Sequence, residues 1–293
     1  MTRRAALAAL SAASALAQDA RKAAGPPPRT TPALCLYSDQ MMKVGYEEMG
    51  GILKMIGFDG VDLMVQPGGH ITPEHADLDL ERGIESMNGS GVNVYSVSTS
   101  ITAPTDKTLQ TAVSWAGQMG VPVFRPGDWK YGTGAEPEQR LAQVAREMQF
   151  FSQIGAQVGV AVAIHNGPVD SVGAALWDTQ MVIRGLDPRT IGYAYDTGYG
   201  ASQGPVALRL AASRLKMVVA RDGYWSKEGG AWKFVECPLG EGMVDWQEVF
   251  AALRKAEFTG PVSLRVGYEP KDELNAIKKD LDFLKKHRAS AFA

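Results

Sequence analysis

The fold of this chain is decided by short apolar runs such as Val160-Ala161-Val162-Ala163-Ile164-His165. Seven further runs of this kind are Ala33–Tyr37, Gly60–Val65, Val92–Ser98, Val121–Arg125, Ile191–Asp196, Leu215–Arg221 and Val262–Val266. Helix-length segments separate them, and short buried strands that alternate with helices indicate parallel βα units. Eight such units predict an α/β fold, a single (β/α)8 barrel, whose functional site lies at the C-terminal ends of the strands.

The bulk composition agrees with one large barrel domain. The chain has 293 residues, of which 45% are hydrophobic, and a barrel of this kind takes about 250 residues. The formal net charge of −2 provides no basic surface for nucleic acid or for an anionic membrane. We therefore expect neither a nucleic-acid partner nor a membrane span.

Residues 1–17 have the pattern of an export signal. Arg3 and Arg4 precede an uncharged stretch of Ala, Leu and Ser that ends in Ala15-Leu16-Ala17, an A-x-A cleavage pattern. The paired arginines resemble a twin-arginine signal, and the stretch is too short to span a bilayer. This predicts a periplasmic or secreted protein, with residues 18–32 as a linker and 33–293 as the barrel. The alternative is an Ala-rich amphipathic start that stays on the protein.

The chain has two cysteines, Cys35 inside the first run and Cys237 in an expected loop after the seventh. A small buried residue is the expected role of Cys35, and we predict no disulfide between the two. One long helix is expected over Pro137–Ile154, closed by Gly155 as its C-cap.

Polar residues gather where the strands end. They are Asp39, Gln66, Ser98, Arg125, His165, Asp196, Asp222 and the stretch Arg265–Glu269. Arg125 and Trp129 share a loop that suits a sugar, because the sugar ring stacks on an aromatic side chain while its hydroxyls bond to charged groups. A helix-capping loop with a surface Trp is the alternative. His70 lies on another such loop, where a solvated histidine is the alternative to a functional one.

The last three strands carry the strongest candidates. Asp196 ends an apolar strand beside Gly198, a common setting for a ligand-facing carboxylate, and capping of the next helix is the alternative. Arg221-Asp222 ends the seventh run. Arg265, expected within the eighth strand, faces either the barrel axis or the helices, and both places require an anionic partner. Tyr268 and Glu269 follow it.

The segment Pro238-Leu239-Gly240-Glu241-Gly242-Met243-Val244-Asp245-Trp246, with Gly260-Pro261 before the last strand, resembles the sugar phosphate isomerase/epimerase family of xylose isomerase-like barrels. Gly57-Phe58-Asp59-Gly60-Val61-Asp62 resembles the second-strand motif of that family. The resemblance covers residues 33–287. It implies a barrel that acts on a small carbohydrate.

The resemblance also implies one divalent metal, held by Glu, Asp, His and Glu at the ends of strands five to eight. Here His165 replaces the first Glu, Val219 replaces the His, and Arg265 replaces the last Glu. Asp196 matches the Asp, while Tyr199 stands where a histidine follows it in the family. Asp196 and His165 are thus the plausible surviving ligands, with Asp222 as a third candidate. Three substitutions in four leave the metal in question, since catalytic sites normally offer three protein ligands.

Three functions are considered for this sequence. The first is an exported isomerase or epimerase that removes the proton alpha to a carbonyl. His165 would be the base, Asp196 an orienting carboxylate, and Arg265 with Arg221 the stabilisers of the enolate, Arg265 pairing with Asp196 or with substrate in place of the metal. His70, Arg125, Trp129, Tyr199, Asp222, Tyr268 and Glu269 would bind substrate. The second is a carbohydrate-binding barrel that has lost its chemistry. The third, a metal-dependent endonuclease, is disfavoured by four histidines and a negative net charge.

Overall fold

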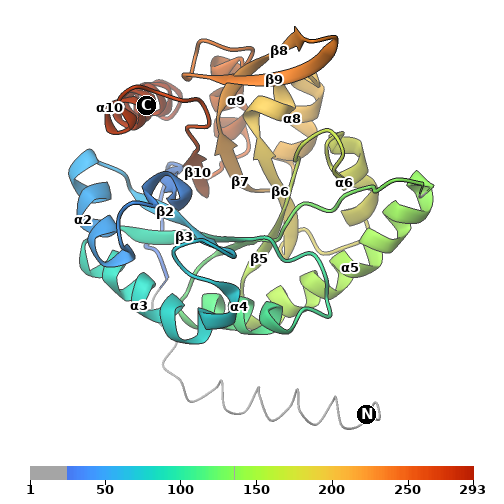
Figure 1. The fold of residues 1–293 in the computed structure, drawn as a ribbon, viewed down its shortest axis with the longest axis horizontal. Helices are drawn as coiled ribbons and strands as arrows, with labels where there is room; N and C mark the ends of the chain where they lie inside the picture. Colours follow the sequence, from blue (N-terminus) through green and yellow to red (C-terminus); the bar gives the residue numbers. More distant parts are fainter. Residues whose placement is uncertain (1–24, 135) are drawn as a thin grey trace.

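The computed structural model describes residues 25–134 and 136–293. In this part of the chain, eight parallel strands close into one ring, and Figure 1 shows helices around its outside. The strands of the ring, in order, are β1 (Ala33–Tyr37), β2 (Gly60–Val65), β3 (Asn93–Thr99), β4 (Val123–Arg125), β5 (Ala161–His165), β6 (Ile191–Asp196), β7 (Leu215–Ala220) and β10 (Pro261–Leu264). The predicted (β/α)8 barrel is confirmed. The predicted export signal lies outside the described residues.

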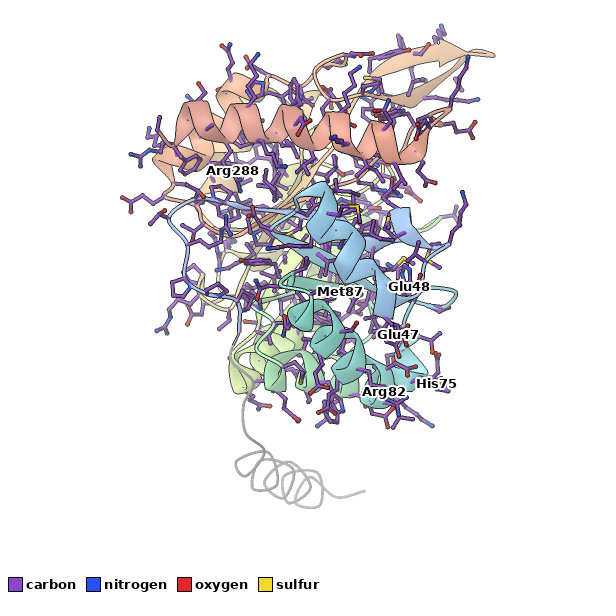
Figure 2. The ribbon with its side chains drawn as sticks, turned by 90° about the vertical axis from the view of Figure 1, so that its left-hand side faces the viewer. Glu47, Glu48, His75, Arg82, Met87 and Arg288 are labelled. Atoms are coloured by element: carbon purple, nitrogen blue, oxygen red, sulfur yellow. The ribbon has the colours of Figure 1, made fainter. Side chains whose placement is uncertain are left out.

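Helices connect consecutive strands of the ring. They are η1 (Ser38–Met41), α2 (Tyr46–Ile56), η2 (Pro73–His75), α3 (Ala76–Gly89), α4 (Lys107–Gln118), α5 (Pro137–Val158), α6 (Leu176–Ile183), α7 (Thr197–Ala201), α8 (Gly204–Ala212), α9 (Trp246–Lys255) and α10 (Glu273–Ala291). Their outer surfaces carry exposed polar side chains such as Glu47, His75 and Arg82 (Figure 2). None of the described helices is both long and apolar enough to cross a membrane.

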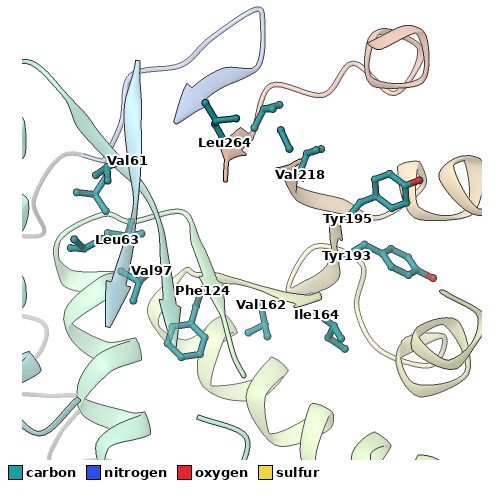
Figure 3. Packing of buried hydrophobic residues seen from close by; sticks show 14 of the residues in the cluster. Val61, Leu63, Val97, Phe124, Val162, Ile164, Tyr193, Tyr195, Val218 and Leu264 are labelled. Carbon is teal, nitrogen blue, oxygen red and sulfur yellow. The ribbon is translucent and has the colours of Figure 1, made fainter. Parts of the chain in front are cut away.

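The alternation of side chains along the strands separates two layers. In β5, Val162 and Ile164 point outward into the core beneath the helices (Figure 3), so Ala163 and His165 point toward the barrel axis. Small and apolar residues fill the axis below the mouth, namely Val123, Ala163, Ala194, Met217 and Val219. A polar residue two positions further along each of these strands therefore reaches the mouth of the barrel.

Several strand and helix boundaries differ from the prediction by one or more residues. β7 ends at Ala220 and β10 at Leu264, so Arg221 and Arg265 stand just past their strands. α5 continues past Gly155 to Val158 and ends at Gly159, whose φ of 76° favours glycine. Gly155 therefore lies inside the helix. Its position requires glycine, because a Cβ there would lie 2.5 Å from the Val160 carbonyl oxygen.

A β-hairpin follows β7 that the sequence analysis did not predict. β8 (Asp222–Glu228) pairs antiparallel with β9 (Ala231–Cys237), and the hairpin lies near β7 at the upper edge of Figure 1. Gly229 and Gly230 join the strands with φ values of 58° and 88°, the two positive values that a type I′ turn needs. Cys237 thus ends a strand rather than lying in a loop, and both Cys35 and Cys237 are free thiols.

Asp222 fixes the loop that carries the Pro238–Trp246 motif. Its carboxylate accepts hydrogen bonds from the backbone N–H groups of Gly223 (2.9 Å), Gly240 (2.9 Å) and Val244 (3.1 Å) and from Trp246 Nε1 (2.8 Å). Asp222 is 1% exposed, so water could not take over these hydrogen bonds if the carboxylate were removed. Asp222 is therefore a structural residue, and the expectation that it binds substrate or metal is wrong.

Replacing Asp222 tests this role. We expect Asp222→Asn to lower the free energy of unfolding by about 2–3 kcal/mol, because the amide nitrogen faces donors and leaves buried N–H groups unpaired. Equilibrium urea denaturation measures this loss. Asp245→Asn is the matched control: Asp245 caps α9 through the Glu248 N–H at 3.0 Å, and Asn caps helices as well as Asp does. Equal losses in the two variants would contradict the special role of Asp222.

Candidate functional site

A histidine held between two carboxylates lies at the mouth of the barrel. His165, at the end of β5, has Nδ1 3.0 Å from Asp128 Oδ1 and Nε2 3.2 Å from Asp196 Oδ2. The side chain of Asp196 is 0% exposed and that of His165 5%, whereas that of Asp128 is 25% exposed. Asp128 is therefore the member of this triad that meets solvent.

The two carboxylates decide the charge of the imidazole. Burial by itself lowers the pKa of His165, but the charge and hydrogen bond of Asp128 and the hydrogen bond of Asp196 outweigh burial and raise it above its usual value. Burial likewise opposes ionisation of Asp128, yet His165 and Arg125 hold the pKa of its carboxyl well below its usual range. The two carboxylates therefore favour the protonated imidazolium over the neutral ring.

Asp196 is also bound by Arg221. The guanidinium Nε lies 2.9 Å from Asp196 Oδ2 and 3.1 Å from Oδ1, and the Tyr199 N–H donates to Oδ1 at 2.9 Å. Burial favours the neutral acid, but Arg221 and His165 together lower the pKa of Asp196 below its usual value. Asn166 clamps the backbone of Asp196, accepting from its N–H and donating to its carbonyl. The carboxylate is thus fixed in place with both oxygens occupied.

The hairpin encloses Arg221 from the other side. Its Nη1 donates to Glu236 Oε1 at 2.8 Å, and its Cζ lies 3.9 Å from the Tyr199 ring centroid and 5.4 Å from that of Phe234. The Arg221 side chain is only 2% exposed. One buried cation therefore joins two carboxylates and two aromatic rings.

A second polar cluster lies on β2, β3, β4 and β10. Asp62 accepts hydrogen bonds from Ser98 Oγ at 2.6 Å and from Ser263 Oγ at 3.0 Å, and Arg125 Nε donates to Ser98 Oγ at 2.9 Å. The Arg125 guanidinium lies 5.6 Å from the ring centroid of Tyr37. This cluster places a partly buried cation and an aromatic face at the mouth.

The pairing expected between Arg265 and Asp196 is wrong. Arg265 has its Nε 3.8 Å from Asp39 Oδ2, and its Cζ lies 5.8 Å from the Tyr37 ring centroid. The order of strands in the ring explains this: β10 lies between β1 and β7, whereas the strand next to β6 is β7. Arg221, just past β7, therefore reaches Asp196. Gln66, also at a strand end, donates from Nε2 to the Tyr37 hydroxyl at 3.1 Å.

Two residues expected to bind sugar, Trp129 and His70, instead make hydrogen bonds to other parts of the protein. Trp129 is 2% exposed, donates from Nε1 to Glu147 Oε2 on α5 at 2.6 Å, and packs edge-on against Phe151. A buried indole N–H needs such a partner, so Trp129 binds its own helix layer rather than facing the mouth. His70 has Nε2 between the carbonyl oxygens of Met41 (3.0 Å) and Val44 (3.1 Å).

The two candidates after the last strand also lie apart from the triad. The Tyr268 hydroxyl donates to Asp280 Oδ2 on α10 at 2.9 Å, and Glu269 is exposed. Of the predicted residues, the structure thus brings His165, Asp196, Tyr199 and Arg221 into one cluster, and places Arg125 and Arg265 together around Tyr37.

Asp128, Phe234 and Glu236 belong to the site although the sequence analysis did not select them. In the sequence, Asp128 is one acidic residue in the loop that also carries Arg125 and Trp129, and its position alone does not single it out. Phe234 and Glu236 depend on the hairpin, whose signal was the Gly229-Gly230 pair between two β-rich segments. That signal would have predicted the hairpin but not its contact with Arg221.

The donor set does not fit the divalent metal that the family resemblance implies. Val219 has no donor atom, Arg265 is a cation, and the Asp222 carboxylate is bound by four donors. The Asp196 carboxylate is already paired with a buried guanidinium, which would repel a dication. Among the described residues, no group of three or more His, Cys, Asp or Glu side chains could hold a metal ion.

Solved structures similar to this chain include several sugar-processing barrels. The 3-keto-D-glucoside 4-epimerase from E. coli is 14% identical, with 87% of this chain and 99% of that chain covered and a TM-score of 0.69. An L-ribulose 3-epimerase is 15% identical, with coverages of 89% and 95% and a TM-score of 0.69. The IOLI protein, solved with a zinc atom, is 12% identical, with coverages of 89% and 99% and a TM-score of 0.73. At these identities the likeness shows the fold alone.

The search of curated proteins found no match. A family model described as "Xylose isomerase-like TIM barrel" matches residues 51–287, which is most of the chain. The closed eight-stranded barrel agrees with this match, and this chain belongs to the xylose isomerase-like TIM barrel family.

Proposed function

We propose that this protein is a carbohydrate isomerase or epimerase that moves a proton next to a carbonyl group without a divalent metal. Its membership of the xylose isomerase-like family supports a carbohydrate substrate, as do the epimerase names of the similar structures. The observation that carries the metal-free form of the proposal is the Asp196–Arg221 pair. In this pair the permanently charged Arg221 binds Asp196, which is the one acidic residue of the family's metal-ligand pattern that this chain retains.

The roles within the triad follow from its charges. The raised pKa of His165 favours the protonated ring, so we assign it the role of an acid rather than that of the base that the sequence suggested. Donation from Nδ1 to the carbonyl oxygen of a sugar would polarise that carbonyl. Asp128, released from His165 and open to solvent, would accept the proton from the neighbouring carbon. Transfer of the Nδ1 proton of His165 to the carbonyl oxygen would complete an enediol. Asp128 would then return its proton to the former carbonyl carbon while the neighbouring hydroxyl gives its proton to His165, which yields the isomer; protonation of the original carbon on its opposite face by water, with the proton on the former carbonyl oxygen returning to His165, yields the epimer.

Asp196 and Arg221 support this chemistry without touching substrate. Both are buried, so their part is to orient the imidazole and to hold a proton on Nε2, which leaves the Nδ1 proton as the one that is transferred. They are positioning residues. Arg125, with one hydrogen bond to Ser98 among the described residues, is the cation best placed to bind sugar oxygens at the mouth.

A carbohydrate-binding barrel without turnover is the second candidate. It is favoured by one observation: each charged member of the triad already has a charged partner, so the resting site holds no free base. Both candidate functions predict sugar binding, but only the isomerase or epimerase predicts exchange of a carbon-bound proton of the sugar with solvent.

Exchange of the carbon-bound proton with solvent is therefore the decisive reaction. We expect the protein to catalyse deuterium incorporation next to the carbonyl of a ketose in D₂O, read by NMR with EDTA present. D-Tagatose, D-allulose, L-ribulose and a 3-keto-D-glucoside form the panel, because such sugars occur in the names of the similar structures. His165→Gln and Asp128→Asn are each expected to slow exchange by about 10²-fold or more, since each removes one half of an acid–base pair.

His75→Gln is the matched control, because His75 is an exposed histidine on the outer surface (Figure 2), and it should leave the rate unchanged. Exchange that His165→Gln leaves intact would remove His165 from the mechanism. Sugar binding without exchange in the wild-type protein would decide for the second candidate.

The raised pKa of His165 also predicts a pH dependence of stability. A group whose pKa is higher in the folded state stabilises the fold fully below its unfolded value of about 6.5, and this contribution is lost as pH rises through the folded value. We therefore expect the free energy of unfolding to fall between pH 6.5 and pH 9 more steeply in the wild type than in His165→Gln. Urea denaturation at several pH values measures both curves. His75→Gln should follow the wild type, and parallel wild-type and His165→Gln curves would show that His165 is not an imidazolium.

A further inference from the structure

One face of the hairpin carries a line of aromatic side chains. The register of β8 and β9 pairs Gly223 with Glu236, Trp225 with Phe234, and Lys227 with Trp232. Directly paired residues share one face of a two-stranded sheet, and alternate residues along each strand return to that face. Phe234, Trp225 and Trp232 therefore lie on the same face as Glu236.

This face is continuous with the candidate site. Glu236 binds Arg221, and the Phe234 ring lies 5.3 Å from the Tyr199 ring. The Trp225 ring follows, 5.7 Å from Phe234. Trp232 is two residues beyond Phe234 on β9, about 7 Å further along the strand, and it is 66% exposed. The line of rings thus begins in contact with the buried cation and ends in solvent.

Packing explains the inner part of this line but not the outer part. Phe234 fills the space over Gly198 and Gly223, where an added Cβ would lie 2.9 Å and 2.5 Å from its ring. Trp232, in contrast, exposes most of a large apolar surface, which hairpin stability does not require. Its cross-strand neighbour Lys227 is also exposed. An exposed aromatic face beside a hydrogen-bond donor suits a sugar ring, which offers C–H groups on its faces and hydroxyls on its edge.

Resting on the function proposed above, we infer that the substrate is an extended carbohydrate, a glycoside or oligosaccharide. Its reacting unit lies at His165, and its further units stack along Trp225 and Trp232. A monosaccharide would occupy only the mouth and would leave these rings unused. The hairpin is therefore the part of the chain that selects substrates by length.

The test measures how affinity depends on sugar length, in the wild type and in variants on each face of the hairpin. Isothermal titration with glucose, cellobiose and cellotriose, and with the corresponding xylose and galactose series, gives affinity as a function of length. We expect affinity to rise from the monosaccharide to the trisaccharide in at least one series. Trp232→Ala should weaken trisaccharide binding about threefold to tenfold, as expected for one aromatic stacking contact, and leave monosaccharide binding unchanged.

Tyr224→Ala is the matched control, because Tyr224 is 43% exposed on the opposite face of the same hairpin, and it should change neither affinity. Thermal melting of both variants verifies that each is folded. Binding that does not depend on length, or that Trp232→Ala leaves unchanged, would overturn the inference while the proposed function stands. No binding in any series would also overturn the inference, while deuterium exchange with the ketose panel decides the proposed function. A dimer that Trp232→Ala dissociates, detected by light scattering, would instead assign this face to a second copy of the chain.

Discussion

The buried ion pair between Asp196 and Arg221 is the interaction on which the rest of the site depends. Removing both charges from water is costly, and a single carboxylate seldom compensates a fully buried guanidinium. Glu236 supplies the second carboxylate, and the rings of Tyr199 and Phe234 cover the guanidinium faces. Since Glu236 and Phe234 both come from β9, burial of Arg221 requires the hairpin to lie over the end of β7.

The same pair determines the chemistry that the site can offer. With Arg221 on one side, Asp196 turns its other hydrogen bond to His165, and Asp128 completes the triad from the loop after β4. The two carboxylates favour the protonated imidazole. In the function proposed above, side chains would supply the charge that a dication supplies in a metal-dependent barrel, and a proton would take the place of a Lewis acid.

The mouth of the barrel therefore has two unlike halves. The half above β5, β6 and β7 is ionic and closed over by the hairpin. The other half, around Tyr37, holds Arg125 and Arg265, and Arg265 has its Nε 3.8 Å from Asp39 Oδ2. In the function proposed above, Asp128 takes part in proton transfer while the aromatic face of the hairpin selects the substrate, so different elements of the fold carry the two tasks.

Much of the fold was predictable from the sequence, because strand periodicity is local. The runs of Val, Ile and Leu locate the strands, and the alternation in Val162-Ala163-Ile164-His165 suffices to turn His165 toward the axis. The partners of the charged residues were not predictable, since they depend on which strands are neighbours in the ring. Arg265 and Arg221 look alike in sequence, yet only Arg221 stands beside β6. Trp129 was misassigned for a related reason, because a loop has no periodicity to show which way its indole faces.

A crystal structure of the protein soaked in Mn²⁺, with data collected at the manganese absorption edge, tests the central claim most directly. We predict no anomalous peak beside Asp196, with the Arg221 guanidinium still bound to both Asp196 and Glu236. A manganese ion bonded to Asp196 and His165, with Arg221 displaced from the carboxylate, would contradict it.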